Sequence, residues 1–152
     1  MMGRQWHRAV FLLCLVLGGV GCTSGEPQIR IVSQEAVPSP VMRGVVSVFM
    51  KIENAGRGSD SLTGAKTDLP GTLVELHDTK NGKMIRTEKI SLPAGSSVSL
   101  QPGGAHIMIF RMPREAGVGS VFSLRLVFGK SGEKNVAVKI IRPSDMRYDH
   151  ES

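Results

Sequence analysis

Short apolar runs separated by turn residues recur along most of the chain. The runs are rich in Val, Ile, Leu and Phe, and the intervals between them contain Gly, Pro or the dipeptide Asn-Gly. No window of ten or more residues shows the 3.6-residue period of an amphipathic helix. The pattern predicts an all-β chain, folded as an antiparallel sandwich or barrel. The expected strands are Ile29–Ser33, Val45–Glu53, Thr72–His77, Met84–Ile90, Ser97–Leu100, His106–Phe110, Phe122–Phe128 and Asn135–Ile141.

Length and charge narrow the class of protein. The 152 residues predict a single domain, and the formal charge of +6 falls to +4 once Arg4 and Arg8, in a segment that we expect to be removed, are left out. Nucleic-acid binding normally needs basic residues on one face and aromatic rings that stack on bases. This chain has one Trp, one Tyr and no run of Lys or Arg, so we expect no nucleic-acid partner.

The first residues predict export from the cytoplasm. They combine arginines, an apolar run and a small-residue exit, as in a secretory signal peptide that is too short to span a bilayer. The stretch ending at Cys22 resembles a bacterial lipobox, in which the cysteine is acylated and anchors the protein to the membrane. We therefore expect a periplasmic or extracytoplasmic protein. Two outcomes remain open, a lipidated Cys22 that serves as a membrane tether and ordinary signal-peptide cleavage nearby. The expected divisions are a signal peptide at 1–21, a linker at 22–28, a β-sandwich domain at 29–141 and a polar flexible tail at 142–152.

Cysteine usage limits the chemistry of the mature chain. Cys14 lies in the signal peptide and Cys22 at its end, so the folded body has no disulfide, thiolate metal site or cysteine nucleophile. The sequence also lacks a nucleophile elbow, a phosphate-binding glycine loop that opens a helix, and a Cys-x-x-Cys-His haem motif. We expect no enzymatic activity, and any metal must be held by His, Met or carboxylate side chains.

Two strand segments each place one imidazole and one thioether on the same face. At 105–110 a period of two puts His106, Met108 and Phe110 on one face and the two isoleucines on the other. Asn81-Gly82 is typical of a type I′ turn, and a hairpin around it pairs Thr79 with Met84. His77 and Met84 then become diagonal neighbours, with Cβ atoms about 7–8 Å apart.

Imidazole and thioether together suit a soft monovalent ion, and Cu(I) is the obvious candidate. The alternative is that these residues only fill space, because a single Met in a strand is usually core packing and a lone His is usually structural. We expect this packing role for Met42, Met50 and Met112. For the four residues of the two pairs, geometry alone leaves both interpretations open.

The spacing of these residues is similar to that of a known family. Periplasmic copper chaperones of the PCuAC type have a signature that runs His, ten residues, Met, twenty-one residues and His-x-Met. The latter part of this signature resembles the present chain, in which twenty-one residues separate Met84 from His106-x-Met108. The surrounding residues also resemble that family, over roughly 45–140. The similar stretches are Phe49–Gly56, Leu73–His77, Leu92–Gly95 and Leu100–Met108.

The resemblance implies a cupredoxin-like Greek-key β-sandwich with one Cu(I) held by His77, Met84, His106 and Met108. It also implies delivery of copper toward the copper centre of cytochrome oxidase, with cytochrome c oxidase subunit II and a Sco-type protein as partners. One departure is that only six residues separate His77 from Met84, which requires a shortened hairpin. Some family members have Met- and His-rich extensions, but Met146 and His150 are a sparse version of one, and a solvated tail is the favoured interpretation.

Two functions from different classes remain open at this stage. One is an extracytoplasmic Cu(I)-binding chaperone. The other is a non-metal, secreted β-sandwich interaction module or envelope lipoprotein that uses a sheet face for protein contacts.

Overall fold

The computed structural model describes residues 25–146, and within them nearly all regular structure is β-strand. The signal peptide, Cys22 and His150 lie outside the described residues. No helix among the described residues is long and apolar enough to cross a membrane. The elements are β1 (Ile29–Pro38), β2 (Val45–Asn54), β3 (Asp60–Thr67), β4 (Leu73–Lys80), β5 (Lys83–Arg86), β6 (Ile90–Leu92), β7 (Ser96–Leu100), β8 (His106–Phe110), β9 (Val121–Phe128), β10 (Gly132–Ile140) and a one-turn 3-10 helix, η1 (Pro143–Asp145).

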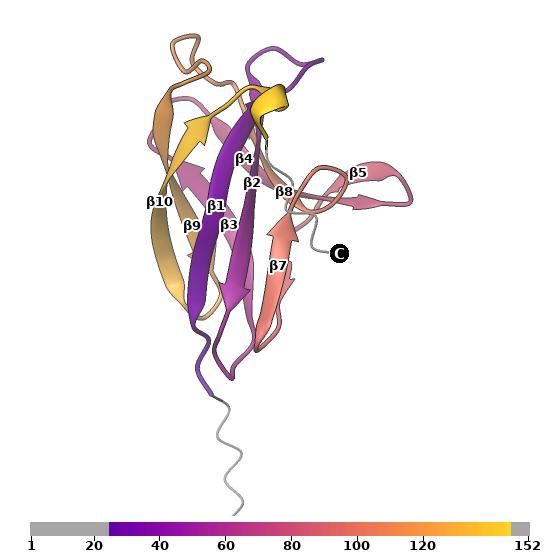
Figure 1. Cartoon of the computed structure of the whole chain (residues 1–152), viewed down its shortest axis with the longest axis vertical. Coiled ribbons are helices and arrows are strands. Elements are labelled where there is room, and N and C mark those ends of the chain that lie inside the picture. The colour runs from indigo at the N-terminus through magenta and orange to yellow at the C-terminus, as the bar shows by residue number, and fades with distance from the viewer. Residues whose placement is uncertain (1–24, 147–152) are drawn as a thin grey trace, which may run out of the picture.

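The strands form one curled sheet that encloses the core (Figure 1). Its order is β5-β4-β8-β2-β1-β10-β9-β3-β6, and β7 pairs with the end of β2 that β8 leaves free. Strands β4 and β8, which are distant in sequence, are therefore neighbours. Among these pairings β1 with β10 is parallel and the others are antiparallel, so the predicted all-β sandwich is confirmed with one parallel pairing added.

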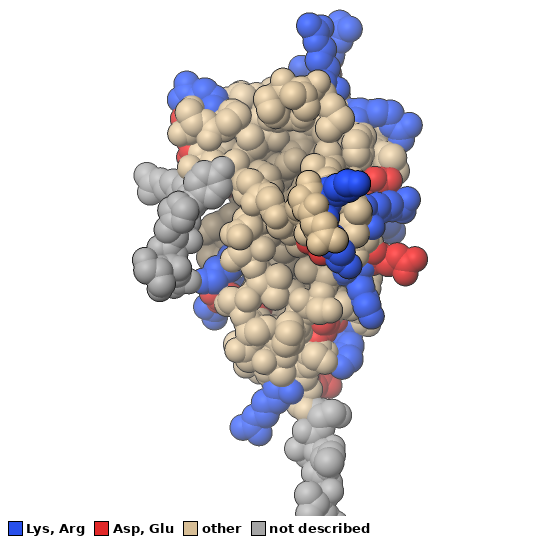
Figure 2. All heavy atoms as spheres, turned by 90° about the vertical axis from the view of Figure 1, so that its right-hand side faces the viewer, with Lys and Arg blue, Asp and Glu red and all other residues tan. Residues whose placement is uncertain are grey.

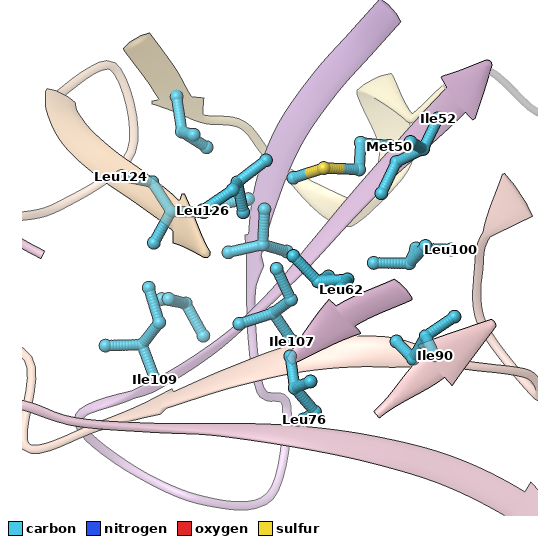
Figure 3. Packing of buried hydrophobic residues seen from close by; sticks show 14 of the residues in the cluster. Met50, Ile52, Leu62, Leu76, Ile90, Leu100, Ile107, Ile109, Leu124 and Leu126 are labelled. Atoms are coloured by element: carbon cyan, nitrogen blue, oxygen red, sulfur yellow. The ribbon is translucent and has the colours of Figure 1, made fainter. Parts of the chain in front are cut away.

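Alternating side chains of the strands fill the interior (Figure 3). Leu76 of β4 and both isoleucines of β8, Ile107 and Ile109, are part of this core. Because successive residues of a strand face opposite ways, the residues on either side of them must face away from the core. This alternation determines where the candidate site lies.

The largest differences between the observed and the predicted strands are at β3, at the segment 84–90 and in β1. β3 was not predicted, because Leu62 is the only large apolar side chain in its eight residues, and the strand is held by pairing with β9 and β6. The segment Met84–Ile90 is two strands, β5 and β6, rather than one. β1 continues past Ser33, where a positive φ of 56° and a register shift mark a bulge, to Pro38.

Two buried polar side chains tie loops to the sheet. Asn54, 1% exposed, donates its Nδ2 to the carbonyl oxygens of Gly58, Leu92 and Pro93. The carboxylate of Asp60, at the start of β3, accepts backbone N–H groups from the β9–β10 turn. These buried hydrogen bonds hold the connections against the sheet, because a buried polar group is costly to leave unpaired.

Candidate metal centre

The two histidines among the described residues, His77 and His106, are direct cross-strand partners. In the β4–β8 pairing His77 lies opposite His106, and their ring centroids are 5.8 Å apart. Directly opposed residues of an antiparallel pair share a face of the sheet. This non-local pairing joins the two His/Met pairs that the sequence placed on separate segments.

The β4–β5 hairpin has the predicted register. Asn81 and Gly82 have φ values of 52° and 72°, as a type I′ turn requires, and Thr79 pairs with Met84. Met84 is thus a diagonal neighbour of His77 on the same face, and the residue is 53% exposed. The hairpin projects sideways from the body of the molecule (Figure 1).

Met108 lies on the same face of the sheet as His77, on strand β8, which pairs with the edge of β4 opposite to β5. It is opposite Glu75 on β4 and Ser47 on β2, and it is only 2% exposed. It is nevertheless outside the hydrophobic core cluster, which takes in the isoleucines on either side of it. The predicted alternation within β8 is therefore confirmed, and Met108 is a buried thioether on the face away from the core.

One hydrogen bond orients the ring of His106. Its Nδ1–H donates to the carbonyl oxygen of Gly104 over 2.8 Å, within the turn that precedes β8. Gly103 in that turn has a φ of 77°, a conformation that favours glycine. With the proton on Nδ1, a neutral ring keeps the lone pair of Nε2 available for a metal ion.

A carboxylate and a guanidinium hold the ring of His77. Its Nε2 lies 3.0 Å from Oε2 of Glu75, and Oε1 of Glu75 lies 3.5 Å from Nη1 of Arg86. The Nδ1 atom of His77 is buried and has no hydrogen-bond partner in the described part of the chain. Sequence reasoning missed Glu75, although the period of two on β4 already put it on the same face as His77.

Aromatic rings flank the imidazoles. The ring of Phe110 lies 6.1 Å from that of His77, and the ring of Phe49 lies 6.1 Å from that of His106. Such rings exclude water and strengthen electrostatic interactions nearby. No group of three or more His, Cys, Asp or Glu side chains that could hold a metal ion occurs within residues 25–146. The strand pairings place two imidazoles and two thioethers on this face, beside the carboxylate of Glu75.

The charges around this face are mainly basic. Lys80, Lys83 and Arg86 of the hairpin are exposed. Figure 2, which looks from the side on which β5 lies, shows Lys and Arg side chains on this side of the molecule, with some Asp and Glu side chains among them.

The methionines outside the candidate site differ in burial. Met50 and Met112 belong to the core cluster, as predicted. For Met42 the expectation of a packing role is wrong, because it is 41% exposed in the β1–β2 connection.

Comparisons with known proteins support the family resemblance. A family model described as "Putative lipoprotein LpqE-like" matches residues 28–140. A relative from Leifsonia xyli subsp. xyli, "Putative lipoprotein Lxx21020", is 29% identical over 88% of each chain.

Solved structures extend the comparison. The copper-bound PCuAC domain of PmoF2 is similar with a TM-score of 0.63 and 26% identity, covering 76% of this chain and 93% of that domain. The apo PCuAC domain of PmoF1 has a TM-score of 0.66 and 25% identity, and the similarity covers 76% of this chain and 94% of that domain. Cu(I)-bound DR1885 from Deinococcus radiodurans shares the fold, with a TM-score of 0.59 and 21% identity, and the similarity covers 74% of this chain and 79% of DR1885. The predicted resemblance to the PCuAC type and the cupredoxin-like fold class are confirmed.

Proposed function

The chain belongs to the LpqE-like lipoprotein family, and from this premise we propose that it is an extracytoplasmic chaperone that binds one Cu(I) through His77, Met84, His106 and Met108. The observation that supports the proposal most is the cross-strand pair of imidazoles next to a buried thioether on the same face. Each imidazole keeps one ring nitrogen without a hydrogen bond among residues 25–146. The copper-bound structure of a PCuAC domain with the same fold adds to this support.

The donor set fits a soft ion that must be released again. Neutral nitrogen and thioether ligands prefer Cu(I) to hard cations. They also bind it less tightly than thiolates do, and the folded body has no cysteine of its own. Copper would therefore pass from this site to a thiolate-rich acceptor.

The shortened hairpin is compatible with ligation by His77. Compared with a ten-residue spacing, the six residues between His77 and Met84 correspond to the loss of two residues from each strand. Because the side-chain period of a strand is two, an even loss from each strand leaves both residues on the same face.

The cytochrome oxidase copper centre is the acceptor that we propose, with subunit II and a Sco-type protein as partners. The basic residues of the hairpin would favour encounter with an acidic acceptor surface, since charges at the rim of an interface mainly raise the association rate. We also propose that residues 1–21 are removed and that a lipidated Cys22 holds the domain at the membrane.

The experiment is an anaerobic titration of the mature protein with Cu(I) against a colorimetric chelator. We expect one tightly held equivalent, lost in His106→Ala and Met108→Ala and kept in the control His150→Ala. A wild-type protein that takes no Cu(I) from the chelator would contradict the proposal and favour a non-metal interaction module.

A further inference from the structure

Glu75 lies where it controls the ring of His77. It precedes His77 by two residues on β4, so both side chains share a face, and it is opposite Met108 on β8. The side chains of His77 and Glu75 are 12% and 16% exposed. Their hydrogen bond is therefore largely shielded from water, which makes it stronger and more directional than a surface contact.

The chemistry of this contact determines which nitrogen of His77 has the proton. An ionised carboxylate can only accept hydrogen bonds, so a neutral ring must place its proton on Nε2 and donate it to Glu75. The lone pair is then on Nδ1. A buried acceptor without a partner is costly, and Nδ1 of His77 is such an atom within the described residues.

Arg86 supports the carboxylate from the hairpin. It is opposite His77 in the β4–β5 pairing, and its Nη1 lies 3.5 Å from the oxygen of Glu75 that does not contact the ring. Both carboxylate oxygens thus have partners. The carboxylate is held between a guanidinium and the ring, in the manner of the carboxylates that orient metal-binding histidines.

We propose that Glu75 is a positioning residue that fixes His77 as its Nε2–H tautomer, so that His77 binds copper through Nδ1 while His106 binds it through Nε2. This inference rests on the proposed Cu(I) function. Binding through Nε2 of His77 would instead break the bond to Glu75 and leave Nδ1 buried without a partner.

The test combines ring-nitrogen NMR with Cu(I) affinity. Long-range ¹H–¹⁵N spectra of the apo protein are expected to show His77 protonated on Nε2 and His106 on Nδ1. Addition of Cu(I) is expected to shift the other nitrogen of each ring. In Glu75→Gln, whose amide can donate as well as accept, we expect His77 to populate both tautomers and the Kd for Cu(I) to rise about 10- to 100-fold.

Glu88→Gln is the matched control, because Glu88 is an exposed acid in the connection that follows β5 and its replacement removes the same charge. It is expected to keep the wild-type Kd and spectrum. If the wild type binds Cu(I) but both variants have the same Kd, or if His77 is protonated on Nδ1, this inference is wrong and the proposed function stands. If the wild type binds no Cu(I), the proposed function fails and this inference fails with it. The tautomer of the wild type needs no variant, so the inference can be refuted even if Glu75→Gln does not fold.

Discussion

Met108 and Met50 are two buried methionines with different surroundings. Both are nearly inaccessible, at 2% and 3% exposure, but only Met50 belongs to the hydrophobic core cluster. Met108 lies on the opposite face of its strand from the core, next to His106. A substitution that keeps volume and removes sulfur therefore separates metal binding from packing.

For Met108→Leu we predict a loss of Cu(I) affinity of at least about tenfold with little loss of stability, because exchanges of Met for Leu usually cost less than about 1.5 kcal/mol. Met50→Leu is the control and is expected to keep the wild-type affinity. Chelator competition and urea unfolding measure the two quantities. Equal Cu(I) affinities for the two variants would mean that Met108 is packing only.

At the scale of elements, the β4–β5 hairpin is the exposed part of the site. All four residues of β5 are exposed, and within the described sheet β5 is an edge strand that pairs with β4. Elements with few buried contacts open locally at low free-energy cost. Met84 is thus the donor that can move away most readily.

We predict that Gly82→Val weakens Cu(I) binding because it destabilises the β4–β5 hairpin. Gly82 has a φ of 72°, where an L-residue costs about 1–2 kcal/mol, so the turn that sets Met84 opposite Thr79 is disfavoured. Gly132→Val, at a φ of 71° in the first residue of β10, is a matched control that leaves the site intact. The Kd for Cu(I) is expected to rise only in Gly82→Val, and amide exchange is expected to accelerate in β5. A similar rise in both variants would point to a general loss of stability instead.

The hairpin and β8 could be predicted from sequence because their geometry is local. Asn81-Gly82 fixes the register of the hairpin, and alternation fixes which side chains of β8 face the core. The contact between His77 and His106 could not be derived in this way, since it depends on the pairing of β4 with β8 in the folded sheet. The hydrogen bond between Glu75 and His77 could not be derived either, because strand alternation puts the two side chains on one face but does not fix their conformations. Strand β3 was not predicted because pairing with neighbouring strands, rather than its own side chains, defines it.

At the scale of the whole molecule, Asp60 links stability to pH. Burial alone would raise the pKa of its carboxyl group, but hydrogen bonds from Ser131, Ser61 and Lys130 outweigh burial and hold the pKa below the ordinary value of 3.8. A carboxyl group whose pKa is lowered by folding stabilises the native state above its unfolded pKa. That contribution is lost as the pH falls through the lower, folded value.

We therefore predict that the free energy of unfolding declines as the pH is lowered below about 4, and that Asp60→Asn declines less steeply. The variant keeps an oxygen that can accept from Ser61 and Lys130, but it has no carboxyl group to protonate. Urea midpoints at a series of pH values give both slopes. Identical slopes for wild type and variant would show that Asp60 does not contribute to the acid sensitivity.

The central claim is that two imidazole nitrogens and two thioether sulfurs from three adjacent strands hold a single copper ion. X-ray absorption at the copper edge of the Cu(I)-loaded mature protein tests it most directly. We predict a first shell of two nitrogen and two sulfur donors per copper, with the sulfur contribution lost when Met84 and Met108 are both replaced by Leu. A shell of nitrogen and oxygen alone, or sulfur scattering unchanged in the double variant, would contradict the claim.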